Sequence, residues 1–185
     1  MQRYKFVQVA LVAACFLALS GGLAYAQQFS ASLSGFSVTG APNAETGAIL
    51  TNGTGNFRLN VSRSSQTASY TLSYSGLTSD VTMAHIHFGQ EHVPGGIMVW
   101  LCQTTAEPSP VQGTPFCPIG GGVVNGQITT ASVVAIEGQN VTAGDFGALL
   151  SALGAKSAYI NVHTTNFPAG EINGQAVLAQ QNANQ

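Results

Sequence analysis

Polar side chains occupy alternate positions in three segments that otherwise have the composition of β-strands. Residues 83–88 contain two histidines two positions apart, and residues 159–163 contain an asparagine and a histidine at the same spacing. Residues 171–175 contain a glutamate, an asparagine and a glutamine in alternation. Alternate residues of a strand point to the same face, so each segment presents its polar groups together. The predicted polar strip consists of His85, His87, Asn161, His163, Glu171, Asn173 and Gln175.

Three residues of the strip are histidines, and their pattern predicts a metal site. Two imidazoles from an H-x-H strand and a third from a neighbouring strand form a recurring three-nitrogen arrangement for zinc or copper, with one position open for water or a ligand. This hypothesis assigns His85, His87 and His163 as the ligands. Asn161 or Glu171 would then hold a ring nitrogen in place.

Two other interpretations explain the same residues without a metal. In the first, the histidines and amide side chains form a satisfied hydrogen-bond network that fixes loops and strand register. In the second, the domain is a module whose loops bind an extracellular protein or a glycan. No nucleophile elbow, phosphate-binding loop or pair of carboxylates is recognisable in the sequence, so it does not indicate an enzyme.

The elements that must position the strip are short strands separated by glycine, proline and asparagine turns. Pro168 and Gly170 mark a turn, so the strands on either side of it are expected to form a hairpin. Residues 143–153 differ, because their apolar side chains recur at i, i+3, i+4 and i+7 and predict one short helix. The pattern as a whole is typical of a sandwich or a barrel. Strands are predicted at 28–34, 55–61, 68–74, 82–88, 96–101, 123–128, 158–163 and 171–178.

The motifs of the strip resemble those of the CHRD domain, which was first described in chordin. Residues 84–89 read A-H-I-H-F-G, residues 159–164 read Y-I-N-V-H-T, and residues 168–175 read P-A-G-E-I-N-G-Q. The family patterns are A-H-I-H-x-G, Y-x-N-V-H-T and P-x-G-E-I-R-G-Q, and the resemblance runs from Phe29 to Leu178. It implies an antiparallel β-sandwich, immunoglobulin-like or superoxide dismutase-like, with one short crossover helix. We expect the chain to act as a non-enzymatic extracellular or periplasmic binding or structural module.

Two positions depart from the family pattern. Asn173 stands where the family usually has arginine, which removes an anion-binding group from the strip. Residues 91–94 read Glu-His-Val-Pro where a Gly-Asn-Gly-Pro type of turn is more usual. The H-x-H strand is also similar to that of copper/zinc superoxide dismutase, itself a sandwich. That similarity is confined to the histidine pair and is an analogy for a copper or zinc site.

The first 26 residues have the organisation of a secretory signal peptide. Arg3 and Lys5 precede an apolar stretch, and Ala-Tyr-Ala at 24–26 supplies the small residues that a signal peptidase reads. The uninterrupted apolar run is about a dozen residues long, whereas a transmembrane anchor needs about 20. A lipidation site at Cys15 fits less well, because the residues after it stay apolar.

Cleavage after Ala26 would leave one CHRD-like domain at 27–179 and a flexible polar tail at 180–185. Of five lysines and arginines, two leave with the signal peptide, so three remain against seven acidic residues. This balance argues against a nucleic-acid partner, which requires a basic surface. We expect a secreted, periplasmic or cell-surface protein whose mature form has no membrane span.

Cys102 and Cys117 are the two cysteines beyond the signal segment. In an oxidising compartment, an even pair at this separation predicts one disulfide that closes a loop. The alternative is a pair of metal thiolates, but the CxxC spacing of such sites is absent from the sequence.

Overall fold

A computed structural model describes residues 27–38 and 47–179 of the chain. The predicted signal peptide at 1–26 and the predicted tail at 180–185 lie outside the described residues. The strands are β1 (Gln27–Ser34), β2 (Thr54–Ser62), β3 (Thr67–Ser75), β4 (Val81–Phe88), β5 (Gly96–Cys102), β6 (Gly122–Ile128), β7 (Ala158–Thr164), β8 (Ile172–Gln175) and β9 (Val177–Leu178), and the α-helix is α1 (Phe146–Gly154). Short 3-10 helices occur at Gly35–Ser37, Thr130–Ser132 and Glu137–Gln139.

The predicted alternation of apolar and polar residues is realised most regularly in β2 and β3. Every second residue of each strand is buried, and the residues between them are exposed or half-buried. Phe57 lies opposite Leu72, and Leu59 lies opposite Tyr70, so the apolar residues of the two strands share one face. Burial of that face against the rest of the protein fixes the register, because a slip by one residue would expose it.

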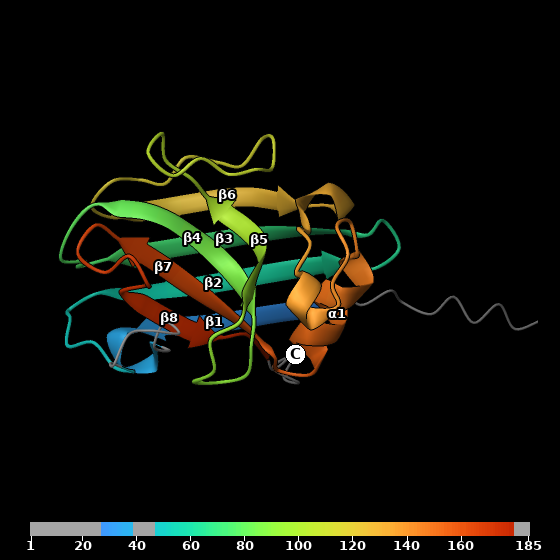
Figure 1. Ribbon diagram of the computed structural model, residues 1–185, viewed down its shortest axis with the longest axis horizontal. Coiled ribbons are helices and arrows are strands. Elements are labelled where there is room, and N and C mark those ends of the chain that lie inside the picture. The colour runs from blue at the N-terminus through green and yellow to red at the C-terminus, as the bar shows by residue number, and fades with distance from the viewer. Residues whose placement is uncertain (1–26, 39–46, 180–185) are drawn as a thin grey trace, which may run out of the picture.

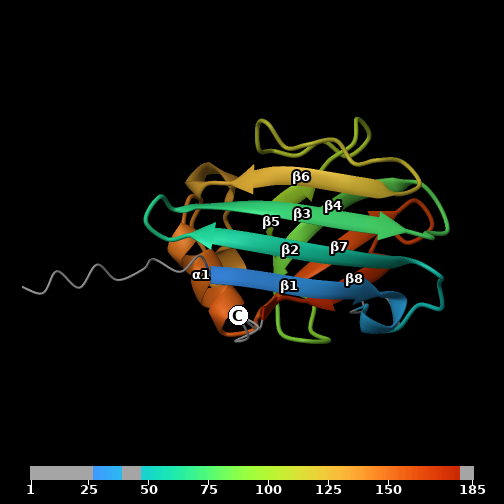
Figure 2. The same cartoon turned by 180° about the vertical axis from the view of Figure 1, so that it is seen from behind.

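The strands form one antiparallel sheet in the order β5-β4-β7-β8-β1-β2-β3-β6, and β9 pairs with β1. The two halves of this sheet lie in two layers. Figure 1 shows β4, β5, β7 and β8 in front, and Figure 2, seen from behind, shows β1, β2, β3 and β6 in front. The Tyr70 hydroxyl of β3 donates to the Leu101 carbonyl of β5 and so links the halves. The expected antiparallel β-sandwich with one helix is confirmed.

The core fills the space between the two layers. Each half of the sheet contributes residues that are almost fully buried. The outward faces of β1, β2 and β3 carry mainly serine, threonine and asparagine, which fits a chain with few charges. The largest fully buried side chains of the core are Phe29, Phe57, Leu59, Leu72, Ile86, Met98, Leu101, Ile128, Leu149, Leu153, Ile160 and Ile172.

Helix α1 connects β6 to β7 and lies at one end of the two layers (Figure 1). It begins after Asp145, whose carboxylate accepts a hydrogen bond of 2.8 Å from the Ala148 amide and caps the first turn. Phe146, Leu149 and Leu153 are buried at the predicted helical spacing. The expected short crossover helix is therefore present, starting after the Asp145 cap.

The Cys102–Cys117 disulfide is present, with a Cα–Cα distance of 5.0 Å. It joins the end of β5 to the loop that leads to β6. In the part of the chain that the structure describes, no helix has the length and apolarity needed to cross a membrane.

Candidate functional site

The polar strip forms on the outer face of the half-sheet that contains β4, β7 and β8. His85 of β4 lies opposite Asn161 of β7, which lies opposite Asn173 of β8. Directly opposed residues share a face, so the three side chains form one row. The predicted pairing of the H-x-H strand with the second histidine strand, and the predicted hairpin of β7 and β8, are both confirmed. The opposite face of these strands enters the core through Ala84, Ile86, Ile160, Val162 and Ile172.

The three predicted histidines lie together and are buried. Their side chains are 0 % (His85), 8 % (His87) and 5 % (His163) exposed. His85 Nδ1 lies 3.2 Å from His163 Nε2, and one ring nitrogen from each of the three residues lies within 4.8 Å of the others. In a tetrahedral zinc site, two nitrogen ligands of the same ion lie about 3.3 Å apart. In the structure this first pair is a hydrogen bond: the Pro168 carbonyl fixes the proton of His163 on Nδ1, so His163 Nε2 accepts and His85 Nδ1 donates. An ion bound by the three rings would replace this contact after the rings move.

Main-chain carbonyls hold two of the rings in place. His87 Nδ1 lies 3.0 Å from the Gly95 carbonyl, and His163 Nδ1 lies 2.9 Å from the Pro168 carbonyl. A carbonyl can only accept, so each Nδ1 carries a proton, and in the neutral ring Nε2 keeps its lone pair. A hydrogen bond on one ring nitrogen that fixes the other as a donor to metal is the usual arrangement around metal-binding histidines.

Two ring nitrogens of the cluster lack partners. The Nε2 atoms of His85 and His87 are sealed from solvent and have no hydrogen-bond partner among the described residues. A buried polar atom without a partner costs about 1–3 kcal/mol. A hydrogen-bond network alone leaves that cost unexplained, whereas a bound ion would use lone pairs on these rings.

Burial keeps the three imidazoles neutral at physiological pH. It lowers the pKa of His87 to about 4 and that of His163 to about 4, although the backbone hydrogen bonds of Gly95 and Pro168 raise both pKa values in part. The pKa of His85 is lowered by burial first, and then by the nearby rings of His163 and His87. Neutral imidazole is the form that binds a metal ion, so these rings need not release a proton to solvent first.

Two aromatic residues, Trp100 and Tyr159, also contact the cluster. The Trp100 ring meets His85 edge-on at a centroid distance of 4.3 Å, and Tyr159 stacks on His87 at 4.9 Å. Strand β5 contains one extra residue between the partners of Ala84 and His85, and this bulge places Trp100 opposite His85. Alternation with Asn161 and His163 already places Tyr159 on this face, whereas Trp100 could not be placed there from the sequence, because a bulge has no signal in the alternation of residue types.

Glu171 belongs to a different network from the histidines. Within the described residues its carboxylate accepts four hydrogen bonds of 2.6–3.0 Å, one from the Thr51 hydroxyl, two from Thr78 and one from the Thr164 hydroxyl. Burial raises the pKa of this carboxyl, but the hydrogen bonds outweigh burial, and the pKa is lowered. Glu171 thus joins three segments of chain. The rings of His87 and His163 are held by backbone carbonyls and not by Glu171.

The Asn161 amide faces the loop between β7 and β8. Its Nδ2 donates to the Ala169 carbonyl at 3.0 Å, and its Oδ1 is buried without a partner among the described residues. Gly170 has φ +118°, and a Cβ at this position would collide with the Asn161 amide. The close approach therefore needs glycine, and it holds the loop that also supplies the Pro168 carbonyl to His163.

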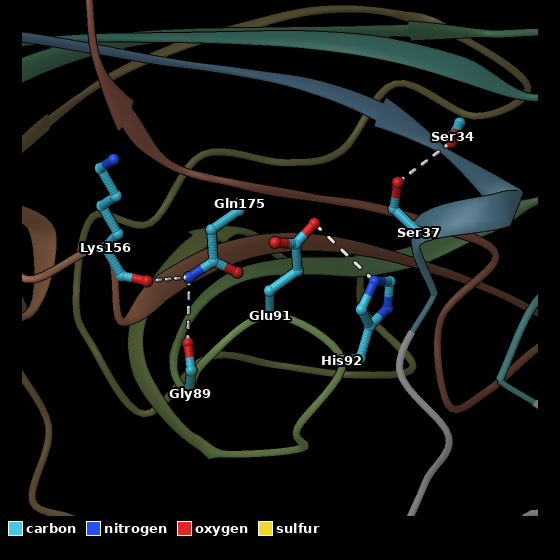
Figure 3. Close-up of polar contacts among 7 residues, drawn as sticks. All are labelled: Ser34, Ser37, Gly89, Glu91, His92, Lys156 and Gln175. Carbon is cyan, nitrogen blue, oxygen red and sulfur yellow. Dashed lines mark hydrogen bonds and ion pairs between the residues drawn. The ribbon is translucent and has the colours of Figure 1, made fainter.

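Gln175, the last residue of the strip, anchors the loop between β4 and β5. Its Nε2 donates to the Gly89 carbonyl at 3.2 Å and to the Lys156 carbonyl at 2.6 Å (Figure 3). Gly95, which holds His87, lies at the other end of this loop. The fourth histidine, His92, is exposed in the same loop and lies 3.7 Å from Glu91 (Figure 3), so it does not belong to the cluster.

The fold and the site define an antiparallel β-sandwich with a buried three-histidine cluster on its outer face. The sequence model of the CHRD domain matches residues 29–176, and the chain belongs to this family. The resemblance expected from the motifs is therefore confirmed. Comparisons with curated proteins and with solved structures gave no match.

Proposed function

We propose that this domain is an exported, non-enzymatic module that binds one copper or zinc ion through His85, His87 and His163. The observation that carries the proposal is the state of the ring nitrogens. Backbone carbonyls hold two rings through Nδ1, while the Nε2 atoms of His85 and His87 are sealed and lack partners among the described residues. A metal ion is the ligand that matches three neutral nitrogen donors at these separations.

The family and the disulfide support an extracellular or periplasmic setting. The match to the CHRD domain is compatible with such a setting, and the Cys102–Cys117 bond is stable where the surroundings are oxidising. The N-terminal 26 residues supply the export signal in this proposal.

Metal analysis of the purified mature protein tests the proposal. We expect about one equivalent of copper or zinc per chain and a raised melting temperature when the ion is added to protein stripped by chelator. Trp100 is the one tryptophan of the sequence and lies against His85, so its fluorescence should change on binding. His163→Ala should abolish the effect, while His92→Ala, at an exposed position, should retain it. A protein that takes up neither ion, with no thermal shift, would contradict the proposal.

A second candidate function is binding of a neutral glycan beside the strip. A cavity of about 210 Å³ is lined by Ser37, His92, Tyr159 and Asn173, among others. Asn173 lines this cavity, and its Nδ2 has no acceptor among the described residues; because this atom is sealed from solvent, it would donate to a ligand hydroxyl only after the side chain turns toward the cavity. Titration with neutral monosaccharides, followed by NMR, should shift signals from this cavity. Asn173→Ala should weaken those shifts, and unshifted spectra would count against the candidate.

A further inference from the structure

The histidine cluster offers no negative charge to a bound ion. Among the described residues, the group that is close enough to share an ion consists of three histidines and contains no carboxylate or thiolate. Glu171 is occupied by its threonine partners, and Cys102 and Cys117 are joined to each other. The full charge of the ion would therefore remain in a buried setting that supplies no charge of the opposite sign.

That setting discriminates strongly between ions of different charge. The penalty for moving an ion from water into a medium of low dielectric constant rises with the square of its charge, so it is about four times larger for a divalent ion than for a monovalent one. Trp100 and Tyr159, which pack against the rings, are uncharged and do not offset it. A monovalent ion suits this cluster better than Zn²⁺ or Cu²⁺.

The number of donors points the same way. Structural zinc sites are almost always four-coordinate, and catalytic zinc sites complete three protein ligands with water. Here the Nε2 atoms of His85 and His87 are sealed from solvent, which leaves no open path for a water ligand at those nitrogens. The Asn161 amide is turned to the backbone of Ala169 and Gly170. Three imidazoles in a dry site therefore form a three-coordinate set, which a monovalent d¹⁰ ion accepts.

We infer that the cluster is a copper(I) site, in which three neutral imidazoles hold the ion in three-coordinate geometry, shielded from water. This inference rests on the proposed metal-binding function and specifies its ion and oxidation state. Imidazole donors suit copper, and among divalent ions an open nitrogen site would favour Cu²⁺. In this cluster the exclusion of water and the lack of a negatively charged ligand disfavour every divalent ion. Copper(I) is therefore preferred to Cu²⁺.

Competition between ions tests the inference on the unaltered mature protein. Affinities for copper(I) are measured without oxygen against a colorimetric copper(I) chelator, and those for Cu²⁺ and Zn²⁺ against chelators of known affinity. We expect one copper(I) per chain, bound about a hundredfold or more tightly than either divalent ion. A hundredfold preference over Cu²⁺ raises the one-electron potential of the bound copper by about 120 mV relative to free copper.

The outcomes separate the two proposals. Tighter binding of Zn²⁺ or Cu²⁺ than of copper(I) would overturn the copper(I) assignment and leave the three-histidine metal site in place. Failure to bind any of the three ions would overturn both. His87→Leu should remove the copper(I) preference, and His92→Ala provides the matched control at an exposed histidine. The affinities of the unaltered protein decide the question even if the His87 variant does not fold.

Discussion

The metal-free domain should lose stability as the pH falls from 6.5 toward 4. In the folded protein, burial lowers the pKa of His87 and of His163 from 6.5 to about 4, and the pKa of His85 is also lowered. Below pH 6.5 the unfolded chain takes up protons at these residues while the folded chain does not. The unfolding free energy therefore has its full value above pH 6.5 and decreases as the pH falls from 6.5 toward 4.

The size of the loss follows from the pKa values. A fall from 6.5 to about 4 corresponds to about 3 kcal/mol for each of His87 and His163. The two together amount to about 6 kcal/mol, and His85 adds to the loss in the same direction. Typical domains are stable by about 5–15 kcal/mol, so the metal-free protein should be close to unfolding near pH 4. Glu171, whose carboxyl pKa is held below its usual value of 4.5, adds a loss in the same direction that begins as the pH falls through about 4.5.

Urea unfolding followed by circular dichroism, with a chelator present, measures this loss at pH 7.5, 6.5, 5.5 and 4.5. The slope of the unfolding free energy against pH counts the protons taken up on unfolding and should approach three at its steepest. Equal unfolding free energies at pH 7.5 and 4.5 would show that the three histidines are not buried as neutral imidazole in the folded domain.

Three further perturbations test the surroundings of the site. Glu171→Ala leaves threonine donors without their acceptor and should lower the unfolding free energy by about 2–4 kcal/mol in urea titrations; Glu171→Gln, which keeps one acceptor oxygen, should cost less. Gly170→Ala should lower the melting temperature by several degrees, because a methyl group collides with a side-chain amide of β7, while Gly138→Ala, in open space, should not. Reduction of the Cys102–Cys117 bond should lower the stability by about 3 kcal/mol, and an unchanged melting curve in reductant would contradict this.

The strands and the face assignments of the site were predictable because they depend on local alternation. In β4 the apolar and polar residues alternate from Ala84 to Phe88, and in β7 they do so from Tyr159 to His163, so the sequence of each strand indicates which residues share a face. The family motifs then supported the sandwich. Adjacency of β4 and β7 could be expected only as the arrangement that explains the polar strip, and the pairing of His85 with Asn161 confirms it.

The parts that escaped prediction depend on contacts between distant segments. The bulge in β5 sets the contact between Trp100 and His85, and a bulge is not visible in residue types. Thr51 and Thr78, which bind Glu171, lie in loops far from it in sequence. The sequence also could not show which backbone carbonyls hold the histidine rings, because every residue has a carbonyl.

Because backbone carbonyls hold the histidine rings, the sequence of the surrounding loops can vary more freely. The groups that orient His87 and His163 are carbonyls, and these persist whatever side chain the loop carries, provided that the backbone keeps its path. The turn at 91–94 departs from the usual family sequence, yet the Gly95 carbonyl still reaches His87. The orientation of these two rings therefore does not depend on which side chains the loops carry. They can accept substitutions for a new binding partner while the imidazoles beneath them keep their tautomers and their geometry.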